Sequence, residues 1–306
     1  MSEERPTIGL ALGSGSARGW AHIGVIRALE EAGIRPDIVC GTSIGALVAG
    51  AYADGDLDRL EKWVLDLGWN DVVGFLDLSL SGGLIRGERL IGFLREKFFA
   101  LEIGSLPLPF GAVATDLASG REVWLREGML ADAVRASLAL PGLFAPVRRD
   151  GRWLVDGGLV NPVPVSLARA MGAEIVIAVD LNSDLIGRHL RKPAAPAPAK
   201  PPEERADSLI GRLQAGIAAL GAGVAPEQGG APSMVEVLAT AVNIMQVRIT
   251  RSRLVGEPAD LMIAPRLAQL GLMEFHRAKT AIEAGHRATV HAVTTLRELL
   301  GEGGAS

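Results

Sequence analysis

The chain has 306 residues, enough for one large domain with a sizeable core. Hydrophobic residues make up 48% of it and charged residues 22%, which is typical of a globular protein and excludes a disordered or fibrous chain. The 31 basic and 35 acidic residues give a net charge of −4, which removes the main argument for nucleic-acid binding.

The single cysteine, Cys40, excludes an internal disulfide and fits a reducing compartment. The first six residues are polar, unlike a signal peptide, and no stretch reaches the ~18 uninterrupted apolar residues of a membrane span. We therefore expect a cytoplasmic protein. The mean hydropathy of +0.27 leaves peripheral contact with the inner membrane face open.

The first fifty residues indicate a parallel sheet. An apolar run over residues 7–12 leads into a Gly/Ser-rich turn, after which apolar residues recur at helical spacing from Trp20 to Leu29. Residues 37–41 are expected to form a buried strand, and the small residues 44–53 a helix packed closely on the sheet. Strands alternating with helices predict an α/β fold with helices on both faces.

Further strands and helices are expected along the rest of the chain. The strands are 110–115, 122–125, 153–155, 175–179 and 261–263, with a turn at 116–120; the helices are 88–99, 131–137, 165–171, 235–255 and 275–300. A Pro/Ala-rich tract predicts a mobile insertion around 188–206 within a single domain, 1–306. Residues 208–220 have helical apolar spacing and are expected to form a lid, an interfacial helix, or a helix packed on the core or on a second subunit.

Residues 41–45, Gly-Thr-Ser-Ile-Gly, match the G-x-S-x-G nucleophile elbow, in which a sharp strand-to-helix turn lifts a serine hydroxyl out of the sheet. Chance would place such a pattern in this chain roughly 0.2 times, so the match alone is weak. The apolar strand before Gly41 and the small-residue helix after Ser43 strengthen it. The alternative is a serine that only caps an ordinary helix.

The Gly/Ser-rich loop 13–19 follows the first strand and is expected at the same sheet edge as Ser43. Small residues expose backbone N–H groups, as an oxyanion hole or a phosphate cradle requires. The dinucleotide pattern Gly-x-Gly-x-x-Gly fails, because its last position is Arg18, and no acid closes the second strand to hold a ribose.

A serine nucleophile needs a base. The histidines are His22, His189, His276, His286 and His291, and none lies at an expected strand end followed by a loop. Asp156 does, since it follows a strand and precedes Gly157-Gly158. An acid held by glycines there can approach another loop closely, although turn chemistry alone also accounts for it.

Residues 13–19, 41–45 and 156–158 occur in the order and setting of the patatin-like phospholipases, and the chain resembles that family over nearly its whole length. Shorter segments that also resemble the family are 114–116, 135–137, 141–142 and 161–162. The chain is most similar to bacterial members related to the catalytic domain of neuropathy target esterase. The resemblance implies a three-layer α/β/α fold with a mainly parallel central sheet, and a Ser–Asp dyad without histidine.

By this resemblance Ser43 is the nucleophile and Asp156 the base of a lipolytic esterase, phospholipase A or lysophospholipase. Its substrate is an acyl ester or a phospholipid, with no cofactor and no metal. The amides of Gly15, Ser16 and Ile44 are the expected oxyanion donors. The alternative is a catalytically weak regulatory or scaffold protein on the same fold.

The glycine loop departs from the family pattern Gly-Gly-Gly-x-Arg/Lys-Gly, because Ser14 and Ser16 replace two of its glycines. Serine keeps the backbone N–H but tolerates positive φ poorly, so the loop is expected to differ in shape. Arg18 occupies the family's basic position. It is expected either to attract a phosphate head group or to pin the loop.

Overall fold

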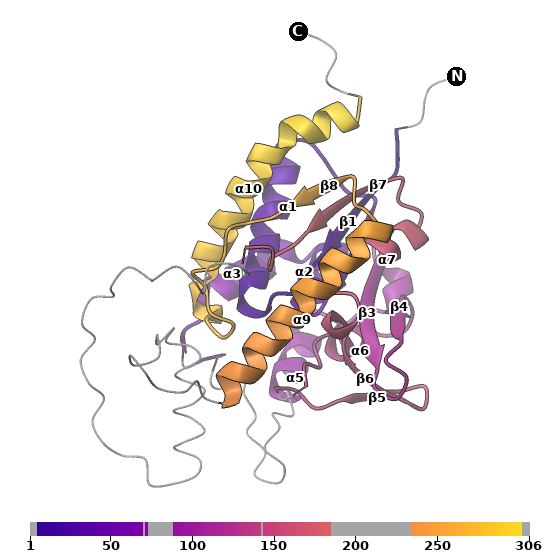
Figure 1. Cartoon of the computed structure of the whole chain (residues 1–306), viewed down its shortest axis with the longest axis vertical. Coiled ribbons are helices and arrows are strands. Elements are labelled where there is room, and N and C mark those ends of the chain that lie inside the picture. The colour runs from indigo at the N-terminus through magenta and orange to yellow at the C-terminus, as the bar shows by residue number, and fades with distance from the viewer. Residues whose placement is uncertain (1–4, 70, 73–87, 142, 185–233, 302–306) are drawn as a thin grey trace, which may run out of the picture.

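A computed structural model of the chain describes residues 5–69, 71–72, 88–141, 143–184 and 234–301 (Figure 1). These residues form an eight-stranded sheet in the order β5-β6-β3-β2-β1-β7-β8, with β4 also paired to β3. The strands are β1 (Ile8–Leu12), β2 (Ile38–Thr42), β3 (Phe110–Asp116), β4 (Glu122–Leu125), β5 (Val147–Arg149), β6 (Arg152–Asp156), β7 (Ile175–Val179) and β8 (Leu261–Ile263). Pairings among β1, β2, β3, β7 and β8 are parallel, and those of β4, β5 and β6 are antiparallel.

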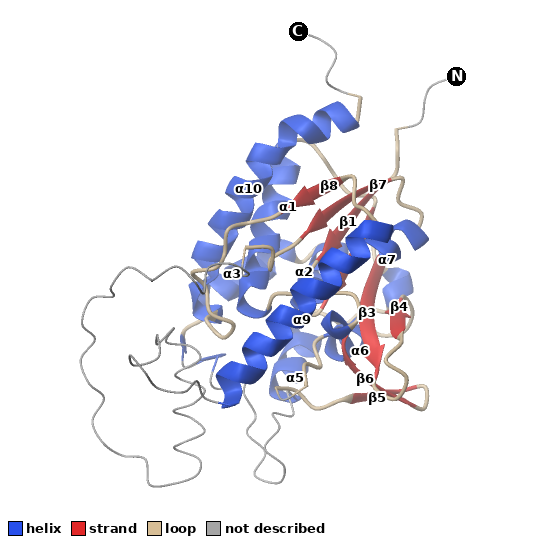
Figure 2. Cartoon of the chain, viewed as in Figure 1, coloured by secondary structure: helices blue, strands red, loops and turns tan. Residues whose placement is uncertain are grey.

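Helices cover both faces of the sheet (Figure 2). They are α1 (Ala21–Glu31), α2 (Ile44–Ala53), α3 (Leu57–Asp66), α5 (Glu88–Lys97), α6 (Leu130–Ser137), α7 (Val165–Ala170), α9 (Met234–Gly256) and α10 (Ala278–Leu299). The core that contains α1, α2, α3, α6 and α10 packs on one face, and α7 and part of α9 pack on the other. The expected three-layer α/β/α fold with a mainly parallel sheet is confirmed.

The two faces of the sheet divide the buried side chains by the alternation of each strand. Leu10 and Leu12 of β1 belong to the larger core beneath α1 and α2, while Ala11 between them belongs to the smaller core beneath α7. Both β1 and β2 are buried at every position. Such two-sided burial is what a parallel sheet with helices on both faces requires.

Strand β3 brings two distant segments together at one of its edges. Strand β2 pairs with β3 up to Thr42, which lies opposite Val113, and β6 pairs with β3 from Asp156, which lies opposite the next residue, Ala114. Strand β4 pairs with residues 112–115 of β3, a stretch that includes residues paired with β2 and residues paired with β6. Strand β4 must therefore lie along the other edge of β3, and β2 and β6 lie along the same edge. They run toward each other and meet end to end, with Ser43 and Asp156 at the junction.

The expected strands and helices are confirmed to within a few residues at their ends, and so is the turn at 116–120, where Asp116 accepts hydrogen bonds from two following amides. Helix α3 and strand β5 were not predicted. Among the described helices, none is long and apolar enough to cross a membrane. The insertion expected at 188–206 and the helix expected at 208–220 lie outside the described residues.

Candidate active site

Ser43 occupies a sharp turn between β2 and α2, with φ 57° and ψ −124°. A non-glycine residue rarely adopts this conformation, and it is typical of strained functional positions. The flanking glycines leave no room for side chains: a Cβ on Gly41 would overlap the backbone of Gly45, and a Cβ on Gly45 would overlap the carbonyl of Leu12. The G-x-S-x-G pattern is therefore required here by close backbone contact.

The strained turn is held by Ser137 at the end of α6. The Ser43 amide donates to Ser137 Oγ over 2.8 Å, and the same hydroxyl donates to the carbonyl of Val113 on β3 over 2.7 Å. One buried side chain thus fixes the elbow to the neighbouring strand. In the sequence, Ser137 belongs to the segment 135–137 that resembles the family, and no local pattern assigns it a role.

Ser43 and Asp156 are brought into direct contact. The Ser43 hydroxyl donates to Asp156 Oδ2 over 2.5 Å, across 113 residues of chain. The other carboxylate oxygen, Oδ1, accepts the Gly158 amide over 2.7 Å, and Thr115 Oγ1 donates to the Asp156 carbonyl over 2.8 Å. Both carboxylate oxygens are therefore fixed, one by a backbone amide and one by the hydroxyl.

Burial sets the proton affinity of this carboxylate. Only 1% of Asp156 is exposed, and loss of solvation raises its pKa from the ordinary 3.8 to about 6. Hydrogen bonds from Ser43 and Gly158 act in the opposite direction, but they are the smaller effect. The result is a carboxylate that is ionised at neutral pH and more basic than an exposed aspartate.

The four described histidines are engaged elsewhere. His22 is fully buried, contacts the carbonyl of Gly13 over 2.7 Å, and has a pKa lowered by burial to about 4. His286 contacts Glu31, His291 contacts a carbonyl in its own helix, and the ring of His276 packs edge-on against a tryptophan. Among the described residues, no hydrogen bond joins a histidine to Ser43 or Asp156.

The loop after β1 is anchored on both sides of its centre. The Ser14 amide donates to the carbonyl of Pro162 over 2.8 Å, and the Ala17 amide donates to the carbonyl of Leu272 over 3.1 Å. Residue 162 belongs to the short segment 161–162 that resembles the family. The loop between these two anchors is therefore positioned by distant parts of the chain.

Between the anchors, the amides of Gly15 and Ser16 have no acceptor among the described residues, and neither does the amide of Ile44 at the first turn of α2. The N-terminal amides of a helix have no partner within it and favour negative charge. The three amides expected as oxyanion donors are thus among those that internal hydrogen bonds leave available. The Ser43 amide is not, because it is bonded to Ser137.

The two serines that replace glycines are both accommodated. Ser16 has φ 52°, the positive value that disfavours serine, and its hydroxyl donates to the carbonyl of Leu272 over 2.6 Å. Ser14 donates through Oγ to Gln246 Oε1 on α9 over 3.1 Å. Each added hydroxyl therefore ties the loop to the C-terminal part of the chain.

Arg18 lies inside the protein. Only 1% of Arg18 is exposed. Its Nε donates to the carbonyl of Gly15, and its Nη2 donates to Asn243 Oδ1 on α9, each over 3.2 Å. Burial lowers its pKa to about 10, an effect that the nearby carboxylates Asp180 and Asp184 oppose. Arg18 is therefore charged at neutral pH and points into the loop and α9.

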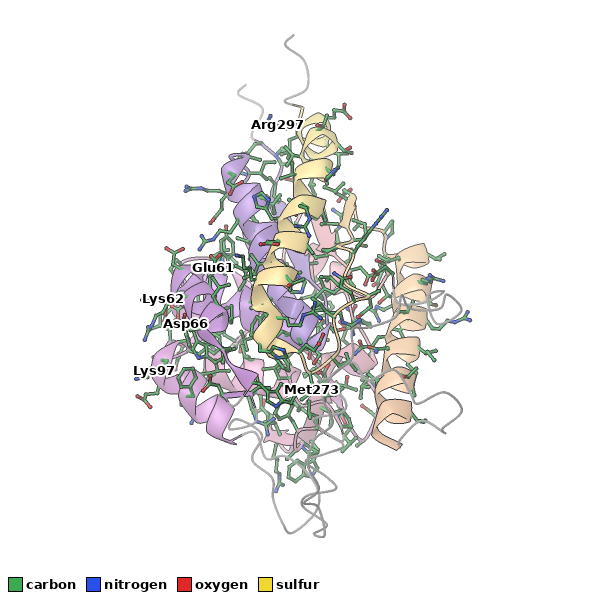
Figure 3. The ribbon with its side chains drawn as sticks, turned by 90° about the vertical axis from the view of Figure 1, so that its left-hand side faces the viewer. Glu61, Lys62, Asp66, Lys97, Met273 and Arg297 are labelled. Carbon is green, nitrogen blue, oxygen red and sulfur yellow. The ribbon has the colours of Figure 1, made fainter. Side chains whose placement is uncertain are left out.

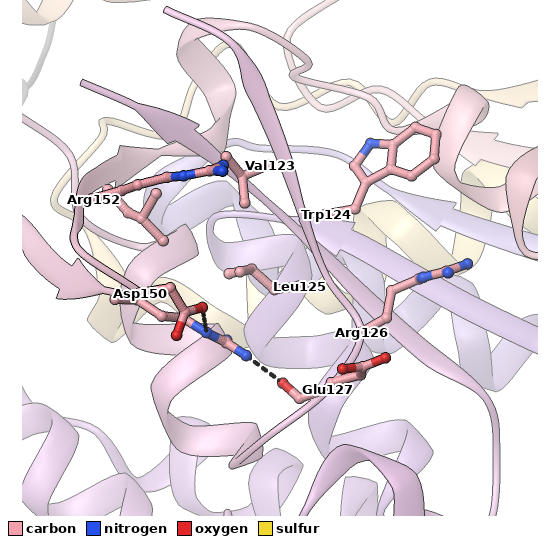
Figure 4. A pocket seen from close by; sticks show the side chains of 9 residues that line it. Val123, Trp124, Leu125, Arg126, Glu127, Asp150 and Arg152 are labelled. Carbon is pink, nitrogen blue, oxygen red and sulfur yellow. Dashed lines mark hydrogen bonds and ion pairs between the residues drawn. The ribbon is translucent and has the colours of Figure 1, made fainter. Parts of the chain in front are cut away.

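A hollow of about 350 Å³ lies beside the sheet, between β4 and the β5–β6 hairpin (Figure 4). Its lining is Val123, Trp124, Leu125, Arg126, Glu127, Arg149, Asp150, Arg152 and Leu154. Arg149 donates within it to the carbonyl of Glu127 over 2.6 Å. Neither Ser43 nor Asp156 lines the hollow, so it is separate from the reacting groups. No cluster of metal-binding side chains occurs in the described part of the chain.

The chain is similar in sequence and in fold to known proteins. The sequence pattern of a family described as patatin-like phospholipase matches residues 10–169. An NTE family protein of Mycobacterium tuberculosis is 34% identical, over 94% of this chain and 91% of that protein. The patatin-like phospholipase domain-containing protein 6 of Homo sapiens is 37% identical, over 58% of this chain and 13% of that protein. VipD from Legionella pneumophila is similar in fold, with a TM-score of 0.57 at 15% identity, over 95% of this chain and 67% of that chain.

Proposed function

Because the chain belongs to the patatin-like phospholipase family, we propose that it is a lipolytic serine acyl hydrolase with Ser43 as nucleophile and Asp156 as the only base. The observation that carries this proposal is the 2.5 Å hydrogen bond from Ser43 Oγ to Asp156 Oδ2. A nucleophile within hydrogen-bond reach of its base is the expected geometry for covalent catalysis.

In acylation, Asp156 takes the proton of the Ser43 hydroxyl as Oγ attacks the ester carbonyl carbon. When the tetrahedral intermediate collapses, the protonated carboxyl returns that proton to the leaving alcohol. Water then attacks the acyl-enzyme, Asp156 accepts a proton from it, and the acid product leaves as Ser43 regains its hydrogen. With its pKa at about 6, Asp156 approaches the ordinary value of histidine, ~6.5.

The negative oxygen of each tetrahedral intermediate needs donors that are already in place. The unbonded amides of Gly15, Ser16 and Ile44 supply them in this proposal. Each donor of this kind is typically worth ~3 kcal/mol of transition-state stabilisation. The buried position of Arg18 supports pinning of the loop, through the Gly15 carbonyl, over direct contact with a head group.

The proposed substrate is an acyl ester of phospholipase A or lysophospholipase type, reached by peripheral contact with a membrane. No step in this proposal requires a cofactor or a metal ion, since the proton moves only between Ser43, Asp156, the leaving alcohol and water. The protein is proposed to act in the cytoplasm at the inner membrane face.

Labelling by a fluorophosphonate probe tests the proposal, because only an activated serine reacts with it. We expect the wild-type protein to be labelled and to hydrolyse members of a lipid panel, and Ser43→Ala to do neither while keeping its fold by circular dichroism. Labelling of Ser43→Ala equal to that of the wild type would refute the assignment. Absence of labelling in both would support the regulatory or scaffold alternative.

A further inference from the structure

Helix α9 buries polar side chains and exposes large apolar ones, which is unusual for a helix that only covers a core. Its buried side chains include the polar Gln246 and Thr250, which are 6% and 3% exposed. Its exposed side chains include four large apolar ones: Val237 is 46% exposed, Ile244 49%, Met245 47% and Val255 86%. Buried polar groups and exposed apolar groups are the informative departures from ordinary packing.

The exposed residues form one face. Their spacing along the helix is seven, four, three and four residues, which keeps them on one side of an α-helix. They are residues 237, 244, 248, 251 and 255. Two of them are the exposed arginines Arg248 and Arg251. Among the described residues neither lies within ion-pair distance of a carboxylate, and the charge of Arg251 acts at longer range to lower the pKa of the largely buried Asp180. We call this set, with Met245, the outer face of α9.

The inner face of the same helix contacts the catalytic loops. Gln246 accepts the Ser14 hydroxyl, Asn243 accepts Arg18, and Arg253 donates to the carbonyl of Val160 just after the Asp156 turn. Since a helix with its side chains is about 10 Å across, the outer face lies roughly that far above the proposed oxyanion loop.

The outer face is also apart from the mixed charges elsewhere on the surface. When the molecule is turned by 90°, α9 lies at the right-hand edge of the view, and Glu61, Lys62 and Asp66 of α3 lie on the left (Figure 3). That opposite side carries both signs of charge. The outer face carries arginines and apolar side chains, although the whole chain has a net charge of −4.

We propose that the outer face of α9 docks on the surface of a bilayer that contains anionic phospholipid. The combination of arginines with apolar side chains on one helical face is the chemistry that binds the interface of such a membrane. This inference rests on the proposed function, because a lipid hydrolase must meet its substrate at a membrane. It names the part of the protein that makes the contact.

Vesicle sedimentation tests the proposal with full-length Ser43→Ala protein, so that hydrolysis cannot alter the lipid. We expect binding to vesicles of equimolar phosphatidylcholine and phosphatidylglycerol, weakened by salt, and little binding to phosphatidylcholine alone. Adding Arg248→Gln and Arg251→Gln should weaken binding about 30-fold, about fivefold for each arginine. Ile244→Ser with Met245→Ser should weaken it as strongly.

Control variants lie on other helices. Arg59→Gln with Arg287→Gln changes the net charge equally, and Val290→Ser removes an exposed apolar side chain from α10; each should bind like the parent protein. In the active protein, the α9 variants should keep full turnover of a water-soluble short-chain ester. Loss of that turnover would point to distortion of the site instead of lost docking.

Two outcomes would overturn the proposal. One is equal vesicle binding by the parent and the α9 variants. The other is a parent dimer in light scattering that the apolar α9 variant converts to a monomer, which would make this face a contact between two copies. Fluorophosphonate labelling tests the proposed hydrolase activity independently of vesicle binding. A protein that is not labelled but binds the anionic vesicles through α9 would contradict the hydrolase proposal and still support the docking proposal.

Discussion

Replacing Asp156 by asparagine should abolish ester hydrolysis and, at the same time, stabilise the folded protein. The carboxylate is 1% exposed and its pKa is raised from 3.8 to about 6, chiefly by burial. Asparagine keeps an oxygen for the Gly158 amide and can donate to Ser43, but it carries no charge to desolvate. The variant therefore loses the base and removes an unfavourable buried anion.

The size of the gain follows from the two pKa values. A shift of about two units corresponds to roughly 3 kcal/mol, since each unit is worth 1.36 kcal/mol. Because the folded-state pKa is raised, the folded protein binds the proton more tightly than the unfolded chain, and stability falls as pH rises from about 4 through 6. The advantage of Asp156→Asn should be about 3 kcal/mol at pH 8 and shrink to about 1 kcal/mol at pH 4.5.

Urea unfolding of wild type and variant at both pH values measures this difference, and titrations of other groups cancel in the comparison. Asp66→Asn, at an exposed position on α3, controls for the loss of one negative charge. Turnover should fall by at least a thousandfold in Asp156→Asn, in line with the loss of a sole base. A variant that is destabilised equally at pH 8 and pH 4.5, or that keeps activity within tenfold of wild type, would refute the reasoning.

Three further outcomes follow from the site. Activity of the free enzyme, as kcat/KM, should fall about tenfold per unit below pH 6 and level off above it, because only ionised Asp156 accepts a proton; a flat profile down to pH 5 would contradict this. Ser137→Ala should lower kcat by ten- to a hundredfold with little change in KM, because the Ser43 amide loses its acceptor, and equal kcat values would show that the elbow holds without it. Gly158→Ala should also lower kcat, since its Cβ would lie 2.5 Å from Gln246 Nε2 and 3.0 Å from Asp156 Oδ1. Adding Gln246→Ala to this variant should partly restore kcat. If kcat stays low in the double variant, the damage comes from the contact with the carboxylate.

Local sequence was sufficient for most of the strands and helices and for the elbow. The turn at Ser43 depends on Gly41 and Gly45, whose close backbone contacts leave a signature within five residues. Helix α3 also had a usable signal, because its buried residues Leu57, Leu60 and Val64 recur at helical spacing. Strand β5 had none, since it is three residues long and two of them are arginines.

The partners of the elbow could not be found in the same way. Whether Asp156 contacts Ser43 depends on the register of β2 and β6 along one edge of β3, and no local pattern specifies a register across 113 residues. Ser137 and Gln246 are single polar residues in otherwise ordinary helices, so nothing in their neighbourhood distinguishes them. The spacing of α9 predicted a helix but not which of its faces would be buried.

The site combines two features that oppose stability, and the surrounding contacts explain why both persist. Ser43 has a positive φ that is unfavourable by about 1–3 kcal/mol for a non-glycine residue, and Asp156 is a nearly unsolvated anion at neutral pH. Each is held by a hydrogen bond: Ser137 on α6 accepts the strained amide, and Gly158, two residues after Asp156, donates to the carboxylate. An unstrained turn at residue 43 would move the hydroxyl away from the carboxylate, and an exposed Asp156 would be solvated and less basic. In both cases Ser43 would lose the base that makes it a nucleophile.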